Sequence, residues 1–304
     1  MIKLKWHGSR LILSNLMVFG KTDRMVYILG DRFRAVGRSD VGRVRTLNED
    51  NFIINEALGL LIVADGMGGH DAGEVASAQV IASIQESLQK FMHPRIDPNV
   101  TLAQEIKRQE RQEQFDIGEE PTLDDLPNPL LDTILSALNR ANHKVHSINA
   151  QKGYPEGMGM GSTVVGFWLP KISQVPVIFH VGDSRLYLFR RGRLVQVTQD
   201  HSMYQQWKNY GGKGRPPAQN ILLQAMGPAQ KITPDIQFQD VQTGDIILIC
   251  SDGLSGMLSD AHIGSLLAQL TEKNMEKICH QLVDDAKEAG GKDNITVILG
   301  HIFP

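Results

Sequence analysis

The stretch from Gly59 to His70 reads GLLIVADGMGGH, and the interpretation of the rest of the chain starts from it. Leu60 to Ala64 is a continuous apolar run, too short for a helix and rich in branched residues, so it predicts a strand buried on both faces. Asp65 follows at the end of this strand, where a carboxylate can meet other groups at the mouth of a core. The glycines after it let the backbone come close to a bound ion or anion. Taken alone, the pattern also fits a simple Asp-Gly turn.

The same pattern, an acid beside glycine or asparagine at the end of an apolar run, recurs along the chain. The acids that share it are Asp65, Asp183, Asp252 and Asp293, and Glu49 and Asp50 stand just before another short run. Like charges gathered at one place are costly unless a cation compensates them. Carboxylates and a backbone carbonyl, without cysteine or paired histidine, favour a hard cation such as Mg²⁺ or Mn²⁺ over zinc. Gly244-Asp245 precedes its strand with ordinary turn chemistry and is interpreted as structural.

The bulk composition is that of an ordinary globular protein. The chain has 304 residues, of which 41% are hydrophobic and 21% charged. The net charge of -3 supplies no basic field for nucleic acid or anionic lipid, so neither partner is expected. Cys250 and Cys279 form no disulfide framework and no CxxC motif, which suits a reducing cytosol, and we expect a cytoplasmic protein. No apolar run approaches the ~18 residues of a membrane span.

Hydrophobic periodicity predicts two long helices in the first half of the chain and shorter elements after it. One helix runs from Ala72 to about His93, and the other carries the apolar stripe between Leu131 and Ile148. The predicted strands are 33–39, 51–55, 60–64, 161–169, 175–181, 186–189, 194–197 and 246–250, with a last strand after Asp293 and two late helices at about 263–270 and 275–289. This order lacks the regular β-α alternation of a doubly wound sheet.

Three segments do not fit these elements. Residues 1–30 are interpreted as an N-terminal extension of unknown role, because their apolar stretch is not followed by a cleavage site. Residues 93–130 hold five prolines around a charged run and predict an insertion or mobile loop. Residues 201–225 are rich in glycine and proline and predict an irregular loop.

Six motifs taken together resemble a known family. In chain order they are VRTLNED, ADGMGGH, VGDSRLY, TQDHS, CSDGL and GKDNITV. They are similar to those of the protein phosphatase 2C family, the metal-dependent Ser/Thr phosphatases, in its bacterial form, and the resemblance covers about residues 33–302. It implies an α+β fold in residues 31–304, a four-layer α-β-β-α sandwich of two antiparallel sheets with a pair of long helices on each outer face. It also places 201–225 at the position of the family's flap.

The resemblance further implies a set of metal ligands at the matching positions. Asp65 would bridge two metal ions. The carbonyl of Gly66 and the side chain of Glu49 would complete the protein ligands of one ion, partly through water. Asp252 and Asp293 would hold the other ion. The cofactor implied is Mn²⁺ or Mg²⁺.

Three more residues receive roles in the same way. Arg45 would meet the substrate phosphate, Asp50 would orient metal-bound water, and Asp183 matches the acid that joins a third, weaker metal site. The implied reaction is hydrolysis of phosphoserine or phosphothreonine by direct attack of a hydroxide that bridges two metals. The implied partner is a phosphorylated protein, the product of a bacterial Ser/Thr kinase. Met67 stands where many eukaryotic members have a histidine proposed as general acid, and a thioether cannot deliver a proton.

Two alternative functions remain open at this point. The substrate could be a phosphorylated anti-sigma-factor antagonist, or the chain could be a phosphatase-like regulatory module without turnover. Loss of a metal acid would favour the module, and every expected acid is present. Broad activity on phosphopeptides would favour a general phosphatase over the antagonist-specific enzyme.

Overall fold

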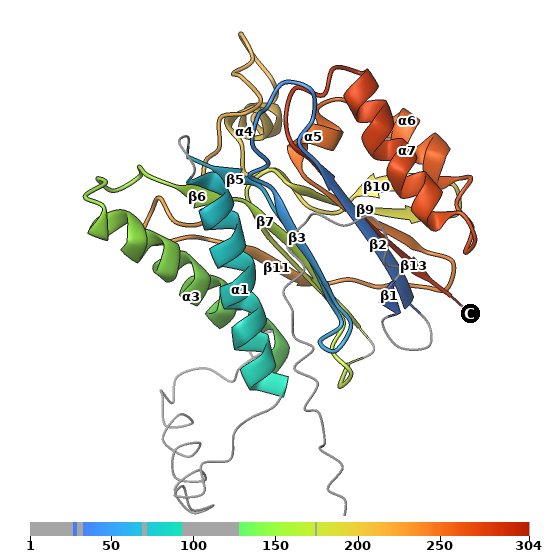
Figure 1. The fold of residues 1–304 in the computed structure, drawn as a ribbon, viewed down its shortest axis with the longest axis horizontal. Coiled ribbons are helices and arrows are strands. Elements are labelled where there is room, and N and C mark those ends of the chain that lie inside the picture. Colours follow the sequence, from blue (N-terminus) through green and yellow to red (C-terminus); the bar gives the residue numbers. More distant parts are fainter. Residues whose placement is uncertain (1–26, 29–32, 69–71, 93–127, 174, 304) are drawn as a thin grey trace, which may run out of the picture.

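The computed structural model describes residues 27–28, 33–68, 72–92, 128–173 and 175–303. Within these residues two antiparallel sheets lie face to face, and helices cover both outer faces (Figure 1). The expected four-layer α-β-β-α sandwich is therefore confirmed. Most of the expected extension at 1–30 and of the insertion at 93–130 lies outside the described residues, as does His70.

The first sheet has six strands in the described part of the chain, in the order β1-β2-β13-β12-β9-β10. They are β1 (Tyr27–Ile28), β2 (Phe33–Asp40), β13 (Ile295–Ile302), β12 (Ile246–Cys250), β9 (Arg185–Arg190) and β10 (Arg193–Gln196). β1 pairs with β2, so this sheet begins inside the range expected as an extension. The two-residue turn between β9 and β10 has positive φ at both positions, 51° at Arg191 and 80° at Gly192, which is the hairpin expected there.

The second sheet has five described strands, in the order β11-β8-β7-β4-β3. They are β11 (Asp235–Phe238), β8 (Val177–Val181), β7 (Val164–Trp168), β4 (Leu60–Ala64) and β3 (Asn51–Asn55). Every residue of β4 is buried, as its unbroken apolar run predicts. The single strand expected over 161–169 is divided at Thr163, and its first part, β6 (Gly161–Ser162), pairs with β5 (Gly66–Met67) in a separate two-stranded ribbon.

The two outer helical layers differ in length. The second sheet is covered by two long helices, α1 (Gly73–Met92) and α3 (Pro129–Gln151). The first sheet is covered by α5 (Asp252–Ser255), α6 (Asp260–Leu267) and α7 (Met275–Glu288). The expected second pair of long helices is thus a shorter set. Between α6 and α7, the Asn274 side chain accepts a hydrogen bond from the Thr271 backbone N–H and fixes a turn.

The expected irregular loop at 201–225 contains a helix, α4 (Met203–Asn209), so that part of the prediction is wrong. Ser202 caps this helix, because its hydroxyl accepts the N–H of Gln205. None of the α4 residues is buried, so α4 has no apolar stripe from which periodicity could reveal it.

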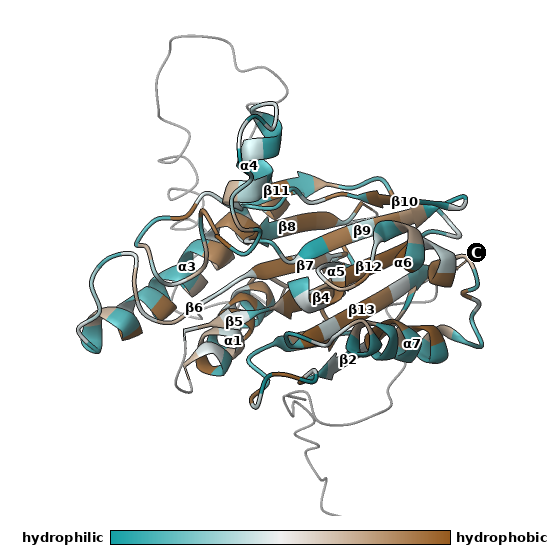
Figure 2. Cartoon of the chain, turned by 90° about the horizontal axis from the view of Figure 1, so that it is seen from above, coloured by the Kyte–Doolittle hydropathy of each residue, from teal (hydrophilic) through white to brown (hydrophobic). Residues whose placement is uncertain are grey.

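Apolar side chains form three layers of contact, one between the sheets and one beneath each helical layer. Figure 2 shows the apolar residues concentrated along the strands and the polar ones toward α4 and the outer helix faces. Trp168 anchors the layer under α1 and α3, where its indole N–H donates to the Leu58 carbonyl at 3.1 Å. None of the described helices is long and apolar enough to cross a membrane.

Replacement of Leu61 by alanine tests the layer between the sheets. Leu61 is fully buried in that layer, so Leu61→Ala should lower the free energy of unfolding by about 2–5 kcal/mol. Val195→Ala, at a position that is 44% exposed, is the control and should change it by less than about 0.5 kcal/mol. Urea unfolding measures both, and equal effects would contradict this assignment of the core.

Candidate metal and phosphate site

Four of the acids expected as metal ligands stand at strand ends in both sheets. Asp65 follows β4 and Asp183 follows β8 in the second sheet. Asp252 follows β12 and Asp293 precedes β13 in the first sheet. The negative charges of Asp252, Asp183 and Asp293 all act on Asp65, so the fold gathers these side chains at one end of the sandwich.

The electrostatics of this cluster favour a bound cation. Burial raises the pKa of Asp65 well above its usual range, and the neighbouring carboxylates raise it further. Burial also raises the pKa of Asp252, with a further contribution from Asp293, although a hydrogen bond with Asp65 opposes the shift. Burial, followed by the charge of Asp252, raises the pKa of Asp183 to about 7. A divalent cation among these groups would remove the cost of ionising them.

The carboxylate of Asp50 has one oxygen held by hydrogen bonds and one oxygen free to bind a metal-held water. Its Oδ2 accepts two hydrogen bonds of 2.7 Å, from the hydroxyls of Ser251 and Thr296. Its Oδ1 has no hydrogen-bond partner, although the residue is only 5% exposed. An unpartnered buried oxygen is costly and is rare in folded proteins. The free oxygen fits a water molecule held by a cation, so the donor set fits a hard divalent metal.

Glu49 and Gly66 are held together at the start of α1. The Glu49 Oε1 accepts the N–H of Gly73, the first residue of α1, at 3.1 Å. The Glu49 carbonyl accepts the N–H of Gly66 at 3.2 Å and the hydroxyl of Ser77 at 2.6 Å. A Cβ at position 66 would collide with the backbone oxygens of Gly73 and Glu49, so the close approach requires glycine.

The loop that carries Arg45 is fixed by one amide side chain. The Asn294 Oδ1 accepts the N–H of Glu49 at 2.8 Å, and its Nδ2 donates to the carbonyls of Val41 and Leu47 at 3.0 and 2.9 Å. Arg45 Nη2 lies 2.7 Å from Asp293 Oδ2. This hydrogen bond raises the pKa of Arg45, and it sets the expected phosphate ligand directly against an expected metal ligand.

Several supporting residues were not predicted from the sequence. Thr163 Oγ1 accepts the Asp65 N–H at 3.1 Å, the Thr163 N–H donates to the Asp65 carbonyl at 2.8 Å, and the Thr163 hydroxyl lies 2.7 Å from that of Ser184. Ser251, Thr296 and Asn294 were missed as well. A signal was present, since Ser184, Ser251 and Asn294 each stand directly beside an acid of the cluster.

Two groups set aside from the sequence lie apart from this chemistry. Asp245 is buried against Arg190, whose Nε and Nη2 reach its two carboxylate oxygens at 2.8 and 2.7 Å, so its role is structural, as expected. Cys250 and Cys279 are fully buried, and burial raises the pKa of each thiol to about 12. Neither thiol is therefore an ionised nucleophile at neutral pH.

The sequence of the chain matches a known protein family and its characterised members. The family model described as Protein phosphatase 2C matches residues 37–289. The Serine/threonine phosphatase stp of Listeria welshimeri is 32% identical over 270 residues, which cover 86% of this chain and 93% of that protein. The Serine/threonine protein phosphatase PstP of Mycobacterium tuberculosis is 30% identical over 274 residues, covering 88% of this chain and 45% of that protein.

A solved structure agrees with these sequence matches. The catalytic domain of serine threonine protein phosphatase PstP in complex with two manganese ions superposes with a TM-score of 0.68 at 30% identity, covering 90% of this chain and 99% of that one. The chain belongs to the protein phosphatase 2C family. It is a metal-dependent phosphoprotein phosphatase of the Ser/Thr type.

The raised pKa of Asp50 should make the free energy of unfolding depend on pH. Burial raises this pKa from the ordinary 3.8 to about 7, so between about pH 4 and pH 7 the folded, metal-free protein holds more protons than the unfolded chain. Its stability should therefore fall as pH rises through this window. One such carboxyl contributes at most about 1.4 kcal/mol per pH unit, and Asp50→Asn should remove its share of the slope.

Urea unfolding in excess chelator at pH 5, 6, 7 and 8 measures this slope. Asp240→Asn is the control, because it removes a carboxylate whose side chain is 72% exposed and should leave the slope unchanged. An Asp50→Asn slope equal to that of the wild type would show that the carboxyl ionises normally in the fold.

Proposed function

We propose that the chain hydrolyses phosphoserine and phosphothreonine in proteins by means of two divalent cations, without a covalent intermediate on the chain. The proposed ion ligands are Asp65, Glu49, Asp252, Asp293 and the Gly66 carbonyl. The observation that carries this proposal is Asp50, which is buried among the carboxylates with one oxygen held by two hydroxyls and the other without a partner.

The two cations, when bound, lower the pKa of a water molecule and stabilise the charge of an in-line displacement at phosphorus. The chain's own residues then have separate roles. Asp50 accepts a proton or a hydrogen bond at Oδ1 while Ser251 and Thr296 fix its Oδ2. Arg45 donates from its remaining N–H groups to a phosphate oxygen, as a planar guanidinium can while it also holds Asp293.

The oxygen donors suit Mn²⁺ and Mg²⁺ alike, and the manganese ions of the PstP structure support Mn²⁺ as the first ion to test. Asp183 is the proposed ligand of a third, weaker ion. The proposed substrate is a protein phosphorylated by a bacterial-type Ser/Thr kinase, because the relatives are named as Ser/Thr phosphatases of bacteria.

Metal removal and return test the proposal directly. Hydrolysis of p-nitrophenyl phosphate and of a phosphothreonine peptide should fall to background in excess chelator and return with Mn²⁺ or Mg²⁺. Asp252→Asn should stay inactive at the same metal concentrations, and the surface variant Asp240→Asn should recover fully. Undiminished turnover by rigorously metal-free protein would refute the proposed mechanism.

Replacement of Arg45 tests its phosphate role. Arg45→Ala should raise KM for a phosphopeptide by about 10–100-fold with a smaller change in kcat, because it removes ground-state binding of the phosphate. Arg43→Ala, two positions earlier in the same loop and also exposed, is the matched control and should leave KM within about twofold. Calorimetric Mn²⁺ titration completes the test, since loss of metal affinity at unchanged KM would assign Arg45 to Asp293 instead of phosphate.

A further inference from the structure

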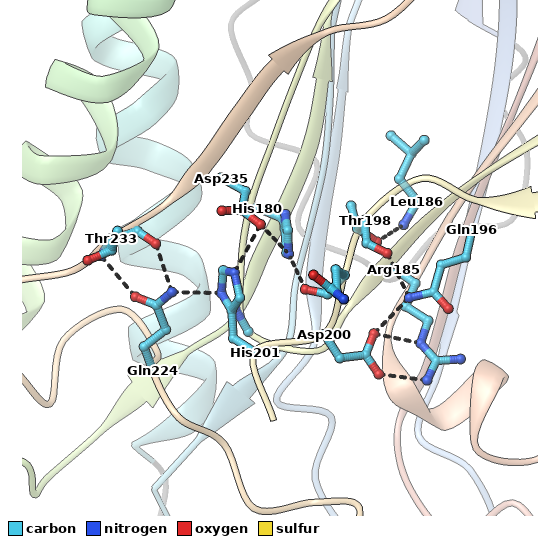
Figure 3. Close-up of polar contacts among 12 residues, drawn as sticks. His180, Arg185, Leu186, Gln196, Thr198, Asp200, His201, Gln224, Thr233 and Asp235 are labelled. Atoms are coloured by element: carbon cyan, nitrogen blue, oxygen red, sulfur yellow. Dashed lines mark hydrogen bonds and ion pairs between the residues drawn. The ribbon is translucent and has the colours of Figure 1, made fainter. Parts of the chain in front are cut away.

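The root of the flap, residues 198–202, is bonded along its length to the segment that carries Asp183. The Gln199 carbonyl lies 2.9 Å from His180 Nε2, and the Asp200 carboxylate pairs with Arg185 through two hydrogen bonds of 2.9 and 2.7 Å. Figure 3 shows His180 and the Asp200–Arg185 pair on one side of His201 and Gln224 on the other. At the centre, the His201 backbone N–H donates to the Gly182 carbonyl at 2.8 Å, and the Gly182 N–H donates to His201 Nδ1 at 3.1 Å.

The surroundings of His201 fix which ring nitrogen carries the proton. Gln224 Nε2 also points at His201 Nδ1, at 2.9 Å. The orientation of this amide is set by Thr233, whose N–H donates to Gln224 Oε1 and whose carbonyl accepts from Nε2 (Figure 3). Nδ1 thus faces two N–H donors and must be the acceptor. The proton of the neutral ring is on Nε2, which lies 3.3 Å from Asp235 Oδ2.

This arrangement excludes a metal site at the same place. Ligand atoms of His180, His201 and Asp235 lie within 4.8 Å of one another, which is close enough for a shared ion. An ion on His201 Nε2 would force the ring proton onto Nδ1, against the two N–H groups. His180 Nε2 is equally occupied, because it donates to the Gln199 carbonyl. These ring nitrogens are therefore engaged in hydrogen bonds to other groups of the chain, and the cluster of His180, His201 and Asp235 holds the flap root in place.

The support acts on the backbone next to Asp183. Both polar groups of Gly182 are bound by the one residue His201, and a Cβ at this glycine, with φ of 108°, would collide with Thr163. On the other side of Asp183, the Ser184 hydroxyl is bonded to the same Thr163 that holds Asp65. The backbone at Asp183 is therefore anchored on both sides. His201 of the flap root holds Gly182 before it, and Thr163, which also holds Asp65, bonds Ser184 after it.

We propose that His201 is a positioning residue that connects the flap to Asp183 and thereby sets the affinity of the third cation, without affecting the two central ions. The proposal rests on the assignment of Asp183 to a third ion. His201 touches neither phosphate nor metal; it acts through Gly182. A flap that moves on binding a phosphoprotein would then change the third site by way of this ring.

Two substitutions at position 201 separate the ring nitrogens. The amide oxygen of asparagine stands close to where Nδ1 stood, so His201→Asn keeps an acceptor for the Gly182 N–H. The amide nitrogen of glutamine stands close to Nε2, so His201→Gln keeps a donor for Asp235 and loses the acceptor. Calorimetric Mn²⁺ titration of the metal-stripped full chain is the first readout. Hydrogen exchange of the peptide containing Gly182 is a second that needs no metal.

The wild type should bind two Mn²⁺ tightly and a third more weakly, and Asp183→Ala should lose only the third. His201→Gln should weaken the third ion at least tenfold, leave the other two within twofold and speed exchange at Gly182. His201→Asn should stay within threefold of the wild type for every ion. If His201→Gln fails to fold, Asp235→Ala takes its place, since the Asp235 side chain is 59% exposed. This variant should weaken binding of the third ion at least threefold, because the His201 Nε2–H loses its acceptor and the ring is held less firmly.

The outcomes separate the two proposals. If Asp183→Ala still binds three ions, the assignment of Asp183 is wrong and the His201 proposal falls with it, whereas the two-metal phosphatase mechanism stands. If Asp183→Ala loses the third ion but His201→Gln, or Asp235→Ala in its place, binds it with wild-type affinity, His201 has no positioning role. Equal losses in His201→Asn and His201→Gln would also overturn the proposal.

Discussion

Asp65 and Asp252 hold like charges largely out of water at the point where the two sheets meet, with the more exposed carboxylate of Asp293 beside them, and no arrangement of the described protein groups neutralises all three. The sheets supply the positions, because each acid stands beside the end of a strand, and the strand residues nearest to it are buried. Raised pKa values at Asp65 and Asp252 record the cost. The loop from β2 to β3 brings Arg45 to Asp293, but one guanidinium cannot balance the whole cluster. The metal dependence of the family follows from this constraint.

Much of the architecture could be predicted because its signals are local. The run LLIVA predicts a doubly buried strand, and the stripes on α1 and α3 predict helices against a core. α4 could not be predicted in the same way, because none of its residues is buried and no apolar stripe marks it. The short strand β11 escaped too, since only Ile236 of its four residues is even half-buried and it forms by pairing with β8.

The residues of the candidate site also differ in whether a local signal predicts them. The acids could be named from motifs, because each needs only its place at a strand end. Their supports could not, because Ser251 and Thr296 reach Asp50 across 201 and 246 positions of sequence. The ion pair of Arg45 with Asp293 spans 248 positions and was equally hidden. Contacts of this kind are products of the tertiary fold, and only the serine or asparagine next to three of the acids, Asp183, Asp252 and Asp293, hinted at them.

Asp50 precedes β3 in the second sheet, whereas Ser251 and Thr296 belong to the ends of β12 and β13 in the first. One carboxylate oxygen is therefore bonded across the interface of the sandwich. The layer between the sheets is made of aliphatic and aromatic contacts, which have little directional preference and would tolerate a small slide of one sheet over the other. The two hydroxyl bonds do not tolerate it, since hydrogen bonds weaken steeply with misalignment. The geometry at Asp50 therefore depends on the relative position of the two sheets. A substitution in the inter-sheet layer that shifts one sheet over the other would misalign these two hydrogen bonds and so alter the site.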